Sequence, residues 1–146
     1  MATFDSVEAI RKEVLKRMET AAWLAEDEVS DIVKEYNDKF YNEYTPVEYI
    51  RTDQLRWWKD GRLQRTGVKT VGNSCVADIF YNDGWDYTDD PDDRGWTTAE
   101  IVNANMYGGH KEHKTAVWLD TVDKLMGDAL AYDILKKSLR KAGLPI

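Results

Sequence analysis

The sequence predicts a single α+β domain of 146 residues. Its predicted elements, in chain order, are a long N-terminal helix, an antiparallel β-ribbon or small sheet, a short helix and a C-terminal helix, with the last two packed on one face. Three observations predict this class: apolar residues recur at helical spacing through the first 44 positions, two β-rich segments flank Gly72-Asn73, and a second helical pattern closes the chain. The length is that of one common domain. We therefore expect one core and four segments: residues 1–44 (long helix), 47–81 (β-ribbon), 82–97 (acidic loop) and 98–146 (helical C-terminal part).

The first segment has the clearest pattern. Neither Pro nor Gly occurs from residue 5 to residue 44, Asp5 or Ser6 can cap the helix start, and Pro46 disfavours helical geometry at Thr45. The apolar residues of one face are Ile10, Val14, Met18, Ala21, Ala25, Val29, Ile32, Tyr36 and Phe40. This helix would be about 50–55 Å long, whereas a globule of this size is about 30 Å across. It must therefore bend, break or overhang, and an overhanging apolar face needs a partner; the alternative is a break near Ala21-Ala22-Trp23.

The later elements follow from strand, turn and capping signals. Residues 62–71 and 74–81 are typical of two strands joined by the Gly72-Asn73 turn. Thr97 and Glu100 form a capping box that opens a short helix reaching about Met106. A last helix is predicted from about residue 120 to residue 142. Its apolar face would contain Val122, Leu125, Met126, Ala129, Ile134, Leu135 and Leu139.

Composition excludes several classes of protein. The net charge of −7 argues against a protein that wraps duplex nucleic acid, which requires a basic footprint. No apolar run reaches about 18 residues, so we expect no membrane span, and the N-terminus lacks the pattern of a signal peptide. The single Cys75 cannot form an internal disulfide, which is consistent with assembly in a reducing cytoplasm.

Opposite charges are concentrated in two neighbouring segments. The basic ribbon consists of Arg51, Arg56, Lys59, Arg62, Arg65 and Lys69. The acidic loop consists of Asp83, Asp86, Asp89, Asp90, Asp92 and Asp93. Pairing between copies of the chain would set their register and orientation. The alternative is that the two segments face each other within one subunit, or face water.

Aromatic residues lie beside both charged segments. The chain has six Trp and eight Tyr, and these residue types are enriched at protein interfaces. We expect Trp57, Trp58, Trp85 and Trp96 to contribute to an interface. Stacking of Trp57 and Trp58 on single-stranded bases is an alternative that the overall charge disfavours.

Catalytic and metal-binding patterns are weak. His110 and His113, an i, i+3 pair, could in principle form a zinc site with Cys75 elsewhere, but no second Cys is available. Cys75 as a nucleophile with His110 as its base would need a geometry that nothing in the sequence indicates, and a buried, inert thiol is the usual outcome in a strand. The acidic loop fails the EF-hand requirements for Gly and Glu, which leaves a casual divalent site as its only metal role. We expect no enzyme activity, no cofactor and no resident metal.

Residues 41–55 carry a resemblance to a known family. Tyr44-Thr45-Pro46 follows the long helix and leads into Thr52-Asp53-Gln54-Leu55, which is similar to the Pro and Thr-Gly-x-Leu-like turn of tail-completion proteins of long-tailed phages and prophages. Asp53 stands where Gly is usual. The segment 113–118 and the ending 139–145 also resemble parts of that family, whereas the acidic loop has no counterpart.

The resemblance implies a virion protein at the head–tail junction or upper tail, assembled in the host bacterial cytoplasm. Such proteins form homo-oligomeric rings, for example hexamers or dodecamers, that contact connector, tail-terminator or tail-tube proteins and enclose a channel through which DNA passes as cargo. In such a ring, acidic side chains facing the channel would repel passing DNA. The alternative function is a small prophage-encoded regulatory or interaction protein that binds one partner through its apolar helix face.

Overall fold

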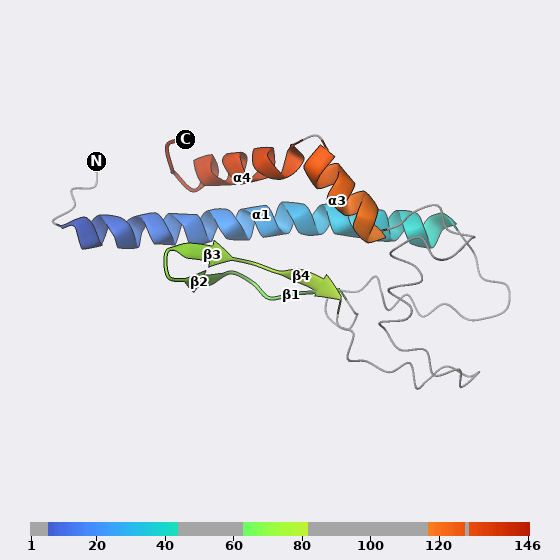
Figure 1. The fold of residues 1–146 in the computed structure, drawn as a ribbon, viewed down its shortest axis with the longest axis horizontal. Helices are drawn as coiled ribbons and strands as arrows, with labels where there is room; N and C mark the ends of the chain where they lie inside the picture. The colour runs from blue at the N-terminus through green and yellow to red at the C-terminus, as the bar shows by residue number, and fades with distance from the viewer. Residues whose placement is uncertain (1–5, 44–62, 82–116, 128) are drawn as a thin grey trace, which may run out of the picture.

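The computed structural model describes residues 6–43, 63–81, 117–127 and 129–146. The elements are α1 (Val7–Glu43), β1 (Leu63–Arg65), β2 (Lys69–Val71), β3 (Ser74–Val76), β4 (Ile79–Tyr81), α3 (Val117–Gly127) and α4 (Leu130–Lys141). α1 is the axis of the molecule, with α4 running along one side of it and the strands along the other (Figure 1). The α+β class is confirmed. The short helix expected near residues 98–106 lies outside the described residues.

α1 is one continuous helix of 37 residues, about 55 Å long at about 1.5 Å per residue. The Ser6 hydroxyl caps its start by accepting a hydrogen bond from the Ala9 amide at 3.2 Å. No break occurs near Ala21-Ala22-Trp23, so the alternative of two shorter helices is wrong. Without Pro or Gly in its interior, α1 keeps its backbone hydrogen bonds while other elements cover it along most of its length.

The buried face of α1 differs from the predicted apolar row. Of that row, Ala21 and Phe40 are buried, Ile10 and Val14 are exposed, and the remaining members are half-buried. The other buried positions of α1 are Glu26, Ser30, Val33, Asn37 and Tyr41. The prediction of a single apolar face was wrong because helices and strands cover α1 from different sides, which draws polar positions into the interior as well.

The strands form one antiparallel hairpin whose register changes by one residue. Arg65 pairs with Ile79 in the β1–β4 ladder, and Lys69 pairs with Val76 in the β2–β3 ladder. Residues 66–68 therefore face only residues 77 and 78, which is the arrangement of a β-bulge. Asp78 holds the bulge, because its carbonyl accepts from the Thr66 amide at 2.9 Å and its amide donates to the Thr66 hydroxyl at 3.1 Å. The predicted pair of strands is confirmed as a hairpin, with an interruption that the prediction lacked.

The two-residue turn of this hairpin is fixed to α1. Gly72 has a φ of 62°, while Asn73 has a negative φ, as in the type II′ turns that suit tight hairpins. The Asn73 side-chain oxygen accepts a hydrogen bond of 2.6 Å from Arg11 on α1. The turn therefore lies against the N-terminal part of the long helix.

The predicted C-terminal helix is in fact two helices. α3 ends at Gly127, α4 begins at Leu130, and between them Ala129 has a left-handed φ of 54°. The break lets α4 run along α1 while α3 crosses the C-terminal part of α1 (Figure 1). The predicted continuous apolar face was therefore wrong: Ile134 is buried, but Val122, Met126 and Leu135 are exposed.

A small aromatic core lies where α1 and α3 meet. Phe40 and Tyr41 form an edge-to-face pair with ring centroids 5.6 Å apart, and Val117 completes the buried cluster. Tyr36 and Trp118 pack against it. The start of α3 is thereby fixed on the C-terminal part of α1.

Candidate subunit interface

The predicted basic ribbon falls only partly on described residues. Arg65 and Lys69 are described, whereas Arg51, Arg56, Lys59 and Arg62 lie outside the described residues. Arg65 forms an ion pair of 2.5 Å with Asp27 of α1 in the same chain, and both side chains remain solvent-accessible. Lys69 lies exposed on β2. The Arg65 charge thus already connects the hairpin to α1 within one subunit.

The residues of the acidic loop and the interface aromatics all lie outside the described residues: Asp83, Asp86, Asp89, Asp90, Asp92, Asp93, Trp57, Trp58, Trp85 and Trp96. His110 and His113 also lie outside them. Pairing of the loop with the ribbon stays a prediction.

Cys75 lies on β3, half-buried against α1. Its sulfur is 3.8 Å from the Thr70 hydroxyl and 4.0 Å from the Leu15 carbonyl oxygen. Within the described parts of the chain, no group of three or more His, Cys, Asp or Glu side chains could hold a metal ion. No helix in those parts has the length and hydropathy needed to cross a membrane.

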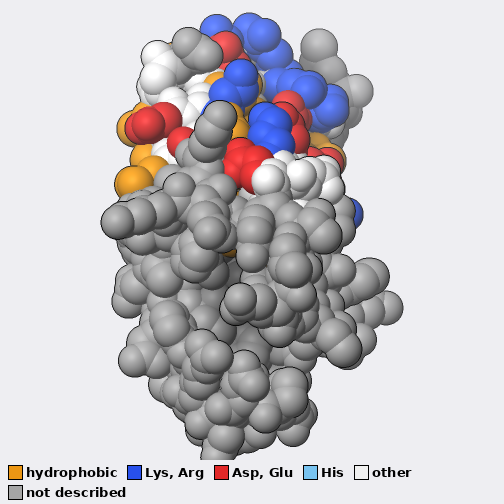
Figure 2. Space-filling view, turned by 90° about the vertical axis from the view of Figure 1, so that its right-hand side faces the viewer, with side chains coloured by type: hydrophobic (Ala, Val, Ile, Leu, Met, Phe, Trp, Pro, Cys, Tyr) orange, Lys and Arg blue, Asp and Glu red, His pale blue; other side chains and the backbone are white. Residues whose placement is uncertain are grey.

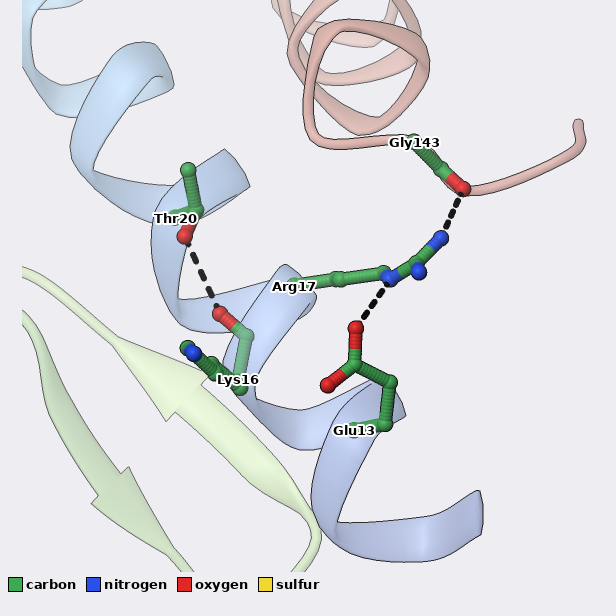
Figure 3. A network of polar contacts seen from close by, with 5 residues as sticks. All are labelled: Glu13, Lys16, Arg17, Thr20 and Gly143. Atoms are coloured by element: carbon green, nitrogen blue, oxygen red, sulfur yellow. Dashed lines mark hydrogen bonds and ion pairs between the residues drawn. The ribbon is translucent and has the colours of Figure 1, made fainter. Parts of the chain in front are cut away.

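Arg17 connects α1 to the residues that follow α4. Its Nε donates to Glu13 at 2.8 Å and its Nη1 donates to the Gly143 carbonyl at 2.6 Å, as Figure 3 shows. Farther along the helix, Lys137 of α4 donates to both carboxylate oxygens of Glu28, at 2.9 and 3.0 Å. Arg17 and Glu28 are eleven residues apart, close to three helical turns, and therefore lie on one face of α1. That face is the one on which α4 lies.

On the N-terminal side of Arg17, α4 does not cover this face of α1. Val7, Ile10 and Val14, here called the N-terminal row, follow one another at steps of three and four residues. Val14 precedes the buried Ala21 by two helical turns, so the row continues the face that α4 covers. The three side chains are 83%, 45% and 38% exposed. Figure 1 shows α1 running on past the end of α4.

A second exposed apolar row lies on α3. Leu119, Val122 and Met126, here called the α3 row, also follow at steps of three and four, and Met126 is 71% exposed. The opposite side of α3 buries Val117 and Thr121 against the rest of the fold. The prediction of one long helix placed Val122 and Met126 in the core; the break at Ala129 turns them outward.

Charges connect α1 and α3 near this second row. A hydrogen bond from Lys39 lowers the pKa of the Glu35 carboxyl, and the charge of Lys124 on α3 lowers it further. The same hydrogen bond raises the pKa of Lys39, to which the charge of Asp120 on α3 adds. Seen end-on in Figure 2, Lys and Arg side chains gather at the top of the molecule with Asp and Glu side chains among them. The helical surface is therefore patterned with both signs of charge.

Glu26 is a buried carboxylate that the sequence pattern did not indicate. It is 5% exposed, and among the described residues neither of its side-chain oxygens has a hydrogen-bond partner. Ser30, one turn along α1, is also buried without a partner for its hydroxyl in the described part of the chain. Such groups lose hydration without compensation and lower the stability of the fold. The only sequence signal was the spacing of Glu26, Ser30, Val33 and Asn37, which is that of one helical face.

Comparison with known proteins places the chain in a family. No curated protein and no solved structure matches it. The sequence model of one family, YomN, matches residues 5–141, which includes all the elements described above. YomN is a family of phage and prophage type. The chain therefore belongs to the YomN family and is a phage-related protein.

Proposed function

We propose that the chain is a structural virion protein at the phage head–tail junction or the upper tail. It acts by ring-type self-assembly and by docking to neighbouring virion proteins around the DNA channel. The observation that carries this proposal is the N-terminal row: α1 extends past α4 and exposes an apolar face there. Exposed apolar rows rimmed by charge mark protein–protein contacts.

Membership of a phage-type family and the tail-completion-like residues 44–55 support the same proposal. Its partners would be further copies of the chain and connector, tail-terminator or tail-tube proteins, with DNA only as cargo. The protein would be assembled in the host cytoplasm and retained in the virion. Its role would be structural, and it would use no cofactor.

The test has three parts. Mass spectrometry of density-purified particles should find the protein in stoichiometric amount, and native mass measurement with electron microscopy of the purified protein should find closed oligomers. A phage lacking the gene should accumulate separate heads and tails. If the protein is absent from particles and forms only a one-to-one complex with a non-virion partner, the proposal fails in favour of the regulatory alternative.

A further inference from the structure

We infer that the N-terminal row of one copy docks on the α3 row of the next copy, head to tail. This rests on the proposed ring-type assembly and names the surfaces that build it. The N-terminal row is Val7, Ile10 and Val14 of α1, and the α3 row is Leu119, Val122 and Met126. Each row is a strip of two helical turns with the same spacing, so one can lie along the other as two helices pack.

The two rows cannot meet within one chain. The α3 row lies beside the C-terminal part of α1, because Val117 of α3 is buried with Phe40 and Tyr41 of α1 and Tyr36 packs against them (Figure 1). Ile10 and Tyr36 are separated by 26 helical residues, which at about 1.5 Å each is about 39 Å. The rows therefore lie near opposite ends of the molecule and can be joined only between copies.

Charge favours contact between an N-terminal row and an α3 row over contact between two N-terminal rows. The first three turns of α1 carry Arg11, Lys12, Lys16 and Arg17 against Glu8 and Glu13, and the helix N-terminus adds a partial positive charge. On α3, Asp123 is exposed next to the apolar row, and Asp120 lies in the first turn. Two N-terminal rows placed together would bring positive helix ends into contact, whereas the α3 row offers carboxylates.

Arg11 is the side chain best placed to reach Asp123 of the neighbour. It flanks the N-terminal row, and one of its terminal nitrogens donates to Asn73 while the other is 3.9 Å from Glu8. A guanidinium has five N–H donors, so the hydrogen bond to Asn73 leaves others for a carboxylate. The bond to Asn73 also limits the motion of Arg11, which lowers the entropy cost of the new contact.

When the contact joins two different surfaces, the first copy of an open oligomer keeps one of the two surfaces free and the last copy keeps the other. Such heterologous contacts continue until they close into a ring or extend as a filament. A contact between two N-terminal rows would instead stop at a dimer. The proposed pairing is therefore of the kind that a ring subunit needs.

The first experiment compares two single variants of the full chain and their mixture. Ile10→Asp disables the N-terminal row, and Val122→Asp disables the α3 row. Sedimentation velocity should show that each variant alone has lost assembly, with a dissociation constant raised about tenfold or more. Their equimolar mixture should form a heterodimer and nothing larger, because only one functional surface of each kind then remains.

Tyr132→Asp is the matched control, because Tyr132 on α4 is 63% exposed and belongs to neither row. It should assemble as the wild type does, and all three variants should keep the wild-type melting temperature. If Val122→Asp still assembles while Ile10→Asp does not, the N-terminal row binds itself and the inference is wrong. If both variants assemble normally, neither row is the contact.

A charge exchange tests the orientation of the contact. Arg11→Glu and Asp123→Arg should each weaken assembly, and the double variant should recover at least part of it, with an association that weakens as salt rises. Recovery would not follow from loss of the Asn73 contact alone. A double variant weaker than both single variants would overturn the head-to-tail pairing.

These outcomes are separable from failure of the proposed function. Rings in solution that depend on both rows, from a protein absent from purified particles, would uphold the contact and refute the virion role. A protein present in particles whose assembly ignores both rows would do the reverse. A wild-type protein that stays monomeric at high concentration would refute the contact itself.

Discussion

Gly67 lies beneath the indole of Trp23 so closely that a β-carbon at position 67 would be 2.8 Å from the ring carbon Cη2. Gly67 belongs to the bulge of the hairpin, has a φ of 69°, and comes from a segment more than 40 residues away from Trp23 in the sequence. The contact therefore fixes how near the hairpin approaches α1.

Gly67→Ala should destabilise the protein more than Gly72→Ala. Both glycines have positive φ, for which a non-glycine residue costs about 1–3 kcal/mol. Only Gly67 would also clash, since nothing lies within 4 Å of a β-carbon at Gly72. Urea unfolding of the two variants isolates the Trp23 contact as the difference between them. Equal losses of free energy of unfolding would mean that Trp23 moves aside without cost.

Ala129→Gly should raise the free energy of unfolding by about 0.5–1 kcal/mol. Ala129 has a left-handed φ of 54° between α3 and α4, a conformation that costs an L-residue about 1–2 kcal/mol and glycine almost nothing. The greater entropy of glycine in the unfolded chain offsets part of the gain. Thermal unfolding measures the change.

Ala131→Gly is the control for that substitution, because Ala131 lies inside α4. The same chemical change there should lower stability by about 1 kcal/mol. Opposite signs at two positions two residues apart would follow from the different backbone conformations of Ala129 and Ala131. Loss of stability in both variants would contradict the prediction, because it would mean that glycine gains nothing from the left-handed φ at position 129.

Glu26→Met should stabilise the fold by about 1–3 kcal/mol, because it replaces a buried carboxylate that lacks a hydrogen-bond partner among the described residues with an apolar side chain of similar length. Glu19→Met is the control, since Glu19 is exposed on the same helix and its replacement should change stability by less than about 0.5 kcal/mol. Chemical denaturation of both variants gives the comparison. A strongly destabilised Glu26→Met protein would contradict this prediction, because it would mean that the Glu26 carboxylate makes a stabilising interaction.

The Glu35 carboxyl should titrate below its ordinary pKa of 4.5, because the hydrogen bond from Lys39 and then the charge of Lys124 favour its ionised form. Since the pKa is lower in the folded state, the stabilisation is complete above the unfolded pKa and is lost as pH falls through the folded one. NMR titration of the side-chain carbon should show the midpoint rise in Lys39→Met, and rise less in Lys124→Met. Lys16→Met, which is remote on α1, should leave it unchanged.

Much of α1 could be predicted from local sequence. The absence of Pro and Gly, the recurrence of apolar residues every three or four positions and the capping Ser6 all favour a helix over residues 7–43. Gly72 likewise determines the hairpin turn, because the turn requires a positive φ. The sequence also predicted that a helix of about 55 Å must bend, break or overhang, because it exceeds the span of a small globule. The structure decided among the three, since α1 is continuous and runs past the end of α4 (Figure 1).

Tertiary structure decided which faces are buried. The bulge at Gly67 follows from the approach of Trp23, and the break at Ala129 from α4 lying along α1 while α3 crosses it. Gly67 and Gly127 are local signals of an interruption, but neither determines how the flanking elements pack. That break turns Val122 and Met126 toward solvent, and cover from several sides draws Glu26 inside. Periodicity indicates which residues share a face of a helix, but only the arrangement of the neighbouring elements decides whether that face meets protein or water.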